Sequence, residues 1–345
     1  MSNQTISDNS KVSGQSIDEV IARWTAVAGS DPELAAICKL LQFLSDEIYC
    51  DYEPYADWPI FWERLGSWIQ NVEGEADQQT LFRLVPWLLF FGKEEMKAMY
   101  RAAFAGPIAR WIIDQAELSL ENPQLRQQFD IAVGETWFGS LAGMDLGSFM
   151  RLNGISEQAL RPEFRVLSHL GDVGKLREYL MGNEQRPNPY RRIVVVEDFV
   201  GTGRQMNDAV RILEELEKIP VLICPIIAAN EGCKKGEGIQ VRTNNRITFA
   251  PHFRIPDAAT LVPETPLHDE PAVFSSTREL VDRTWDRLKL TAHYDLPLGI
   301  GNLGLLVLTY LNCPNNVPPF IHRMTDASDS NCGWFPLFPR VVRES

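Results

Sequence analysis

Two neighbouring acids and a glycine-rich turn are the residues of this chain best suited to chemistry. Glu197 and Asp198 follow the apolar run 193–196 (Ile-Val-Val-Val), and the turn 201–203 (Gly-Thr-Gly) comes shortly after them. Carboxylates accept hydrogen bonds from sugar hydroxyls, and the backbone N–H groups of such a turn hold a phosphate where a helix begins. The stretch therefore predicts a site for a ribose 5-phosphate group.

Two other phosphate-binding motifs fit this turn poorly. A Walker A loop needs a Lys-Ser/Thr pair after its last glycine, but Arg204 and Gln205 follow Gly203. The dinucleotide fingerprint G-x-G-x-x-G needs a third glycine where Met206 stands, and the two acids before the turn would repel a pyrophosphate. A tight strand-to-helix turn with two chance acids stays open as the purely structural alternative.

The stretch resembles the phosphoribosyltransferase signature, in which a hydrophobic strand precedes two acids, two apolar residues, a small or acidic residue and Thr-Gly. The resemblance implies that Glu197 and Asp198 are catalytic residues, which accept hydrogen bonds from the ribose hydroxyls of phosphoribosyl pyrophosphate (PRPP). Carboxylates there also stabilise the cation that develops at the anomeric carbon. The resemblance assigns the 5-phosphate to Gly201, Thr202, Gly203, Arg204 and Gln205.

A longer resemblance covers roughly the C-terminal half of the chain. The core 197–206, the segment 312–316 (Asn-Cys-Pro-Asn-Asn) and the segment 334–340 (Trp-Phe-Pro-Leu-Phe-Pro-Arg) resemble a divergent bacterial phosphoribosyltransferase-like family of conflict and anti-phage defence systems (PRTase-CE-like). It implies an effector or accessory of a defence system that binds PRPP or a nucleotide. Purine salvage enzymes keep an acid where this chain has Gly201. A catalytically inactive sensor or interaction subunit therefore stays open as the alternative.

Three asparagines are further candidates for substrate binding. Asn312, Asn315 and Asn316 follow the expected strand 305–311, and ligands of open α/β sheets bind at the carboxyl ends of strands. Their amides could read a base or a sugar, or could instead bond their own backbone in a turn. For the aromatic segment 334–338 we expect packing on the hydrophobic core rather than stacking on a base.

Weaker candidates come from the middle of the chain. Glu135 follows the strand candidate 129–133 and could belong to a loop that holds pyrophosphate, with Asp145 nearby in the sequence. His169, and Arg186 in the loop 182–190, are candidates for a mobile cover of the site. Segments of this kind are more often ordinary loops.

The order of the predicted elements indicates an α/β fold, a phosphoribosyltransferase-like parallel sheet with a helical N-terminal region. Apolar runs without alternation are typical of strands covered on both faces, and short returns between strand and helix favour a parallel sheet. We expect a disordered tail (1–15), a helical region (16–125) and an α/β domain (126–345). The main expected strands are 193–196, 221–227, 246–250 and 305–311, and the main expected helices are 58–71, 77–91, 93–105, 107–118 and 205–218.

Composition narrows the function classes. The chain has 345 residues with a net charge of −13, which argues against a broad nucleic-acid surface. No apolar run is long enough to span a bilayer, and the polar start of the chain has no hydrophobic signal region, so we expect a cytoplasmic protein. Its six cysteines have no metal-ligand spacing and are expected to be reduced thiols.

The expected cofactor and partners follow from the proposed ligand. Any metal is expected to be Mg²⁺ carried with pyrophosphate, which needs few direct protein ligands. The small-molecule partner is PRPP or a nucleotide. A protein of the defence system and a second copy of the chain are left open as further partners, and no membrane partner is expected.

Overall fold

The chain forms two compact units, one that combines Met1–Lys93 with Asp257–Ser345 and one that contains Glu94–Pro256. This division differs from the expected boundary at residue 125. Residues 94–125 group with the sheet, and residues from 257 onward group with the N-terminal helices. The computed structural model describes residues 16–28, 31–57, 59–141, 144–156, 173–182, 189–216, 218–262, 269–288, 296–324 and 333–341, so the expected tail 1–15 lies outside them.

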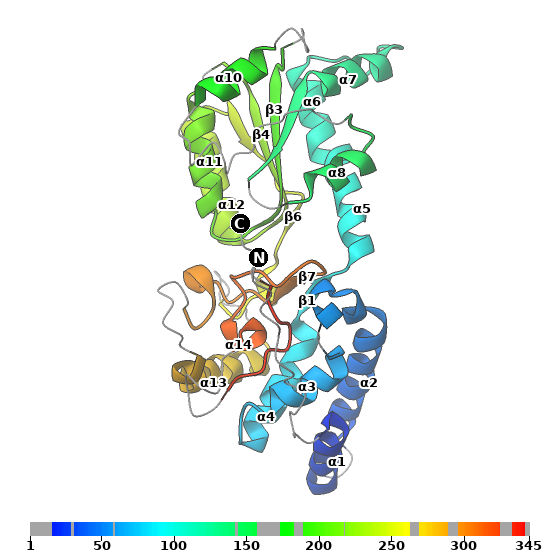
Figure 1. Cartoon of the computed structure of the whole chain (residues 1–345), viewed down its shortest axis with the longest axis vertical. Coiled ribbons are helices and arrows are strands. Elements are labelled where there is room, and N and C mark those ends of the chain that lie inside the picture. The colour runs from blue at the N-terminus through cyan, green and yellow to red at the C-terminus, as the bar shows by residue number, and fades with distance from the viewer. Residues whose placement is uncertain are drawn as a thin grey trace, which may run out of the picture. The chain divides into compact units, whose positions relative to one another are not determined.

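The unit Glu94–Pro256 is built around a five-stranded parallel sheet (Figure 1). Its strands follow the order β2-β3-β4-β5, and β6 pairs with the far part of β4. The strands are β2 (Thr136–Ser140), β3 (Arg192–Val200), β4 (Val221–Ala228), β5 (Ile247–Phe249) and β6 (Phe253–Arg254).

The two central strands confirm the expectation drawn from their apolar runs. Ile193 to Val196 of β3 are fully buried, and every residue of β4 is buried. In the register, Ile193 lies opposite Val221, and Val196 lies opposite Ser140 of β2. A strand with neighbours on both sides and helices on both faces has no solvent-facing positions, so its sequence shows no polar alternation.

Helices cover both faces of this sheet (Figure 1). Ile193 and Val195 of β3 belong to one hydrophobic core with residues of α10 (Val173–Met181), α11 (Arg204–Glu214) and α12 (Asn230–Arg242). The helices on the other side are α5 (Lys93–Ala103), α6 (Ala109–Gln115), α7 (Leu125–Gly134) and α8 (Leu146–Leu152), and a π-helical turn at Phe104–Ile108 joins α5 to α6.

Two expected elements were wrong. Residues 129–133 are not a strand but part of α7. Leu125, Phe129 and Ala132 follow helical spacing toward the protein, while Ile131 is 56% exposed. The expected helix 77–91 was also wrong in its second half, because α4 (Glu75–Leu84) ends before Pro86 and the chain continues into a strand. Pro86 lies in the single 3₁₀ turn Val85–Trp87 that follows α4, and proline has no N–H to continue the hydrogen bonds of an α-helix.

The other unit consists mainly of helices around a two-stranded parallel sheet. The sheet pairs β1 (Leu89–Phe91) with β7 (Val307–Thr309), which is shorter than the expected strand 305–311. Ser16 and Glu19 form the reciprocal hydrogen bonds of a capping box at 3.2 Å each. The helices of this unit are α1 (Ile17–Ala28), α2 (Pro32–Glu47), α3 (Phe61–Ile69), α4, α13 (Ala272–Leu288) and α14 (Pro319–His322).

The aromatic C-terminal segment packs on the core of this same unit, as expected. Phe338 is fully buried, and its ring centroid lies 5.0 Å from that of Tyr49 and 5.2 Å from that of Tyr52. The indole Nε1 of Trp334 donates to the carbonyl of Phe320 at 2.9 Å. These side chains therefore stabilise the fold in the described structure.

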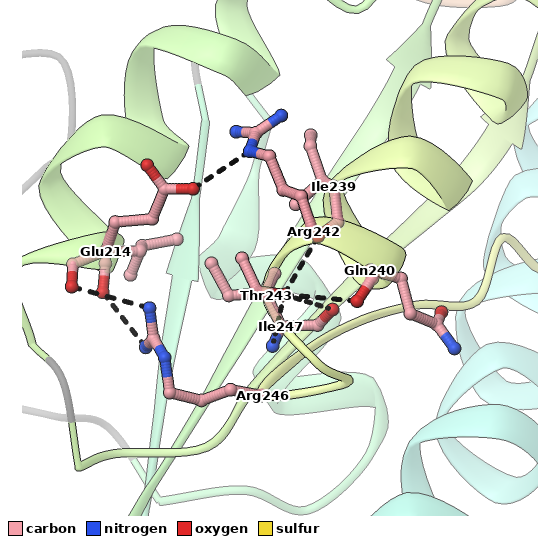
Figure 2. Close-up of polar contacts among 8 residues, drawn as sticks. Glu214, Ile239, Gln240, Arg242, Thr243, Arg246 and Ile247 are labelled. Carbon is pink, nitrogen blue, oxygen red and sulfur yellow. Dashed lines mark hydrogen bonds and ion pairs between the residues drawn. The ribbon is translucent and has the colours of Figure 1, made fainter.

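Arg246 holds the C-terminal end of α11 (Figure 2). Its guanidinium donates to the carbonyls of Leu213 at 3.1 Å and Ile219 at 3.3 Å, and makes a longer contact of 3.5 Å with the carbonyl of Glu214. The last carbonyls of a helix have no partner within the helix, and a cation there also interacts favourably with the helix dipole. Arg246 thus anchors the helix that begins at the glycine-rich turn.

We predict that Arg246→Met lowers the free energy of unfolding by about 1–3 kcal/mol, because several carbonyls lose a charged donor. The matched control is Arg242→Met, whose Nε contacts the Glu214 carboxylate at 3.1 Å on the surface. An exposed ion pair contributes ~0.5 kcal/mol or less. Urea denaturation of both variants measures the difference, and equal losses would contradict the anchoring role of Arg246.

Candidate functional site

The glycine-rich turn leaves β3 and leads directly into α11. Gly203 is the N-cap residue of α11 and has a φ of 69°, in the left-handed region that favours glycine. Having no side chain, Gly203 cannot cap the helix in the way that Ser, Thr, Asp or Asn would. The first N–H groups of α11 thus lack the usual capping acceptor, and a helix start of this kind attracts anions.

The remaining residues of the expected phosphate loop lie around this helix start. Thr202 is partly buried, Gly201 is buried, and Arg204 and Gln205 are exposed on the first turn of α11. The structure thus brings all five expected phosphate-binding residues to one end of one helix. The N–H groups come from the backbone, so this arrangement depends on the turn more than on any single side chain.

The start of α12 packs tightly against the backbone of this turn. The N–H of Ala229 donates to the carbonyl of Val200 at 2.9 Å. A Cβ added to Gly232 would lie 2.7 Å from the Gly201 carbonyl oxygen, closer than real Cβ atoms come. The absence of a side chain at Gly232 is therefore what allows α12 to approach the turn.

Lys235 is a basic residue at the turn that the sequence analysis missed. Its Nζ donates to the carbonyl of Thr202 at 2.6 Å and lies 3.4 Å from the carboxylate of Glu231. Lys235 is the sixth residue of α12. No motif of the sequence marks it, because its contact with the turn arises from the packing of α12 against that turn.

The strand β3 continues through both acids, so the two side chains point to opposite faces of the sheet. Glu197 shares its face with Ile193 and Val195 and is only 6% exposed. Its Oε2 accepts a hydrogen bond from the N–H of Leu141, just after β2, at 2.9 Å. One carboxylate oxygen of Glu197 is thus hydrogen-bonded to the backbone just after β2.

Asp198 lies on the other face of the strand, against α5 and α8. Its Oδ1 accepts a hydrogen bond from the hydroxyl of Tyr100 on α5. Although the residue keeps some exposed surface, burial raises the pKa of Asp198 to about 6, the Tyr100 hydrogen bond opposes this rise, and the charge of Asp145 adds to it. Asp198 is thus a desolvated carboxylate that can change its protonation state near neutral pH.

Asp145 is a second carboxylate whose charge acts on Asp198. It is the N-cap of α8 and accepts hydrogen bonds from the Ser148 N–H at 2.9 Å and the Ser148 hydroxyl at 2.5 Å. These hydrogen bonds lower the pKa of Asp145. The two carboxyls therefore have pKa values shifted in opposite directions, a pattern found where acids have different chemical roles.

Glu135 is not brought to these residues. It precedes β2 at the amino end of that strand, and its carboxylate lies 3.4 Å from Arg191 and 3.4 Å from Arg192. Because β2 and β3 are parallel, with Thr136 opposite Arg192, Glu135 and Asp198 lie near opposite ends of β3. The expected pyrophosphate loop at Glu135 rested on the strand 129–133, which is a helix.

The three asparagines belong to the unit that contains residues 257–345. Asn312 Nδ2 donates to the Val341 carbonyl at 2.7 Å, and Asn316 Nδ2 donates to the Ile300 carbonyl at 2.7 Å. The carbonyl of Asn315 accepts from the Ile300 N–H at 2.8 Å. The Asn312 and Asn316 amides are thus hydrogen-bonded to the backbone of other segments of the same unit. His169 and Arg186 lie outside the described residues.

Comparison with known proteins places this α/β structure in a family. The model of the PRTase-CE family matches residues 65–340. The chain belongs to the PRTase-CE family. Searches of curated proteins and of solved structures returned no match. The PRTase-CE match includes the acids, the glycine-rich turn, Lys235 and Tyr100, and it agrees with the expected phosphoribosyltransferase-like α/β fold.

Three further properties of this PRTase-CE protein concern metal ions, membranes and disulfides. Among the described residues, no group of three or more His, Cys, Asp or Glu side chains could hold a metal ion. The search for membrane-spanning helices, limited to the same part of the chain, found none of sufficient length and hydrophobicity. The described cysteines at positions 38, 50, 224, 233 and 313 form no disulfide.

We predict opposite effects for two glycine substitutions in α12. Gly232→Ala should lower the free energy of unfolding by about 1–3 kcal/mol, because the methyl group meets the turn backbone. Gly238→Ala should raise it by about 0.5–1 kcal/mol, since a Cβ there meets nothing within 4 Å. Thermal and urea denaturation test both changes. Equal stability of the two variants would contradict the close packing of α12 on the turn.

Proposed function

We propose that this member of the PRTase-CE family binds a ribose 5-phosphate group, carried by PRPP or a nucleotide, at the carboxyl end of β3. The observation that carries the proposal is the juxtaposition of a desolvated carboxylate, Asp198, with the start of α11, whose N-cap residue Gly203 has no side chain to cap the helix. Asp198 can accept a hydrogen bond from a sugar hydroxyl, and the N–H groups at the start of α11 can donate hydrogen bonds to a phosphate.

In this proposal each group has a separate task. The N–H groups of residues 201–205 bind the phosphate, and the dipole of α11 favours its negative charge. Lys235 supports the turn from α12 and adds positive charge close to it. Asp198 accepts a hydrogen bond from the sugar, and Glu197 contributes charge from the opposite face of β3.

Mg²⁺ is the metal that suits this arrangement. Mg²⁺ keeps several waters and is commonly held by one or two carboxylates together with substrate phosphates. We therefore propose that the metal arrives with a pyrophosphate-containing ligand and neutralises its charge.

Two outcomes of binding are compatible with the family. A phosphoribosyltransferase or nucleotide hydrolase would use the carboxylates to stabilise the cation that develops at the anomeric carbon. A sensor without turnover is favoured by Gly201, where salvage enzymes keep an acid, and by the use of one Glu197 oxygen within the sheet. We propose the transferase-like activity first and keep the sensor as the second candidate.

The role in anti-phage defence is also a proposal, supported by the likeness of residues 197–206, 312–316 and 334–340 to proteins of such systems. In this role the protein would deplete, modify or sense nucleotides as an effector or accessory subunit. A plaque assay that compares the complete defence system with and without Asp198→Asn tests it. Undiminished protection by the variant would count against a nucleotide-directed role.

We predict that isothermal titration calorimetry detects binding of PRPP or ribose 5-phosphate to the protein, and that Mg²⁺ strengthens the binding of PRPP. Asp198→Asn should weaken binding by about 10-fold or more, because a hydrogen bond to a charged acceptor is lost. The control is Asp130→Asn, an exposed acid on α7 paired with Arg126. The proposal fails if neither phosphorylated sugar binds, or if both variants bind as the unchanged protein does.

A product assay on the same protein separates the two candidate outcomes. Release of pyrophosphate from PRPP, or of free base from a nucleotide, is expected for the enzyme and should disappear in Asp198→Asn. Binding without product over long incubation would establish the sensor instead. The two results are exclusive, so either one decides between the candidates.

A further inference from the structure

The environment of Asp198 contains one more residue that bears on ligand binding. Tyr100 is only 3% exposed, and its hydroxyl donates to Oδ1 of Asp198. Its ring centroid lies 5.8 Å from that of Phe149, in an edge-to-face arrangement. Phe149 in turn contacts Phe104 and Phe138, each with a centroid distance of 6.4 Å. Tyr100 therefore has little freedom to move its hydroxyl away from Asp198.

The two acids of the motif are held in the same manner by different donors. The Leu141 N–H donates a hydrogen bond to one oxygen of Glu197, and the Tyr100 hydroxyl donates one to an oxygen of Asp198. A carboxylate can rotate about its terminal bond with only broad preferences. A fixed donor on one oxygen sets the plane of the group and therefore the direction of the other oxygen.

We propose that Tyr100 is a positioning residue, which orients the carboxylate of Asp198 so that Oδ2 accepts a hydrogen bond from a free ribose hydroxyl. This inference rests on the proposed ribose 5-phosphate site and identifies how that site recognises its sugar. The selected ligands are sugars with an unmodified hydroxyl at this position, because Asp145 and Asp198 together would repel a phosphate there.

The direction of selectivity follows from the donors and acceptors present. With Oδ1 occupied by Tyr100, Asp198 offers an acceptor and needs a donor from the ligand. A hydroxyl supplies that donor, whereas a 2-deoxy sugar supplies none and leaves a buried acceptor unpaired. Ribose 5-phosphate should therefore bind more tightly than 2-deoxyribose 5-phosphate.

The contact also predicts how binding depends on pH. The groups that act on Asp198 are Tyr100 from α5 and Asp145 from the start of α8, and Glu197 precedes it on β3. The pKa of Asp198 is about 6, so affinity should fall as the pH decreases through this value and the carboxylate takes up a proton. The Tyr100 hydrogen bond favours the charged form, and its loss should move the fall in affinity to higher pH.

The test is a pH series of ribose 5-phosphate affinities for the full chain and Tyr100→Phe, which keeps the ring and removes the hydroxyl. At neutral pH we expect Tyr100→Phe to bind about fivefold more weakly, and its pH midpoint to lie above that of the unchanged protein. The preference for ribose over 2-deoxyribose 5-phosphate should shrink in the same variant.

The control is Phe104→Leu, which loosens the aromatic packing around Phe149 without removing the Tyr100 hydroxyl. It should lower stability and leave the pH midpoint unchanged, while circular dichroism confirms that both variants are folded. A folded Tyr100→Phe with an unchanged midpoint and unchanged sugar preference would overturn the positioning role alone. Failure of the unchanged protein to bind any ribose phosphate would instead overturn the proposed function.

Discussion

The parallel pairing of β3 with β4 is the interaction on which the rest of the sheet unit depends. Both strands are buried and are hydrogen-bonded from Ile193 opposite Val221 to Val200 opposite Ala228. A parallel pair requires a crossover, and α11 supplies it. The start of α11 must therefore lie at the carboxyl end of β3, and this constraint places a helix N-terminus beside the acids of the motif.

Close packing of the neighbouring elements then holds the turn and helix α11 that the strand pair positions. Gly232 lets α12 approach the turn, and Lys235 reaches the Thr202 carbonyl from the same helix. At the other end of α11, Arg246 donates to the carbonyls of the last two residues of the helix. The turn is thus held by the helices after it as well as by the strand before it, which keeps its N–H groups in place without a ligand.

The two adjacent acids show how one motif can produce two environments. They point to opposite faces of an extended strand, so Glu197 meets the backbone after β2 whereas Asp198 meets Tyr100 and the charge of Asp145. Desolvation raises the pKa of Asp198, and hydrogen bonds from Ser148 lower that of Asp145. In the proposed site, one carboxyl therefore changes its charge near neutral pH while the other stays charged.

The sequence by itself determined the buried strands, the turn 201–203 and the start of the following helix, because apolar runs and glycines act over short distances along the chain. The apolar run 129–133 predicted a strand but forms a helix, because a short apolar run fits either element. That prediction placed Glu135 at the wrong end of the sheet. Only the tertiary structure brought Tyr100, Asp145 and Lys235 to the motif. Their contacts join segments far apart in the chain, and such contacts arise from packing, which no local pattern encodes.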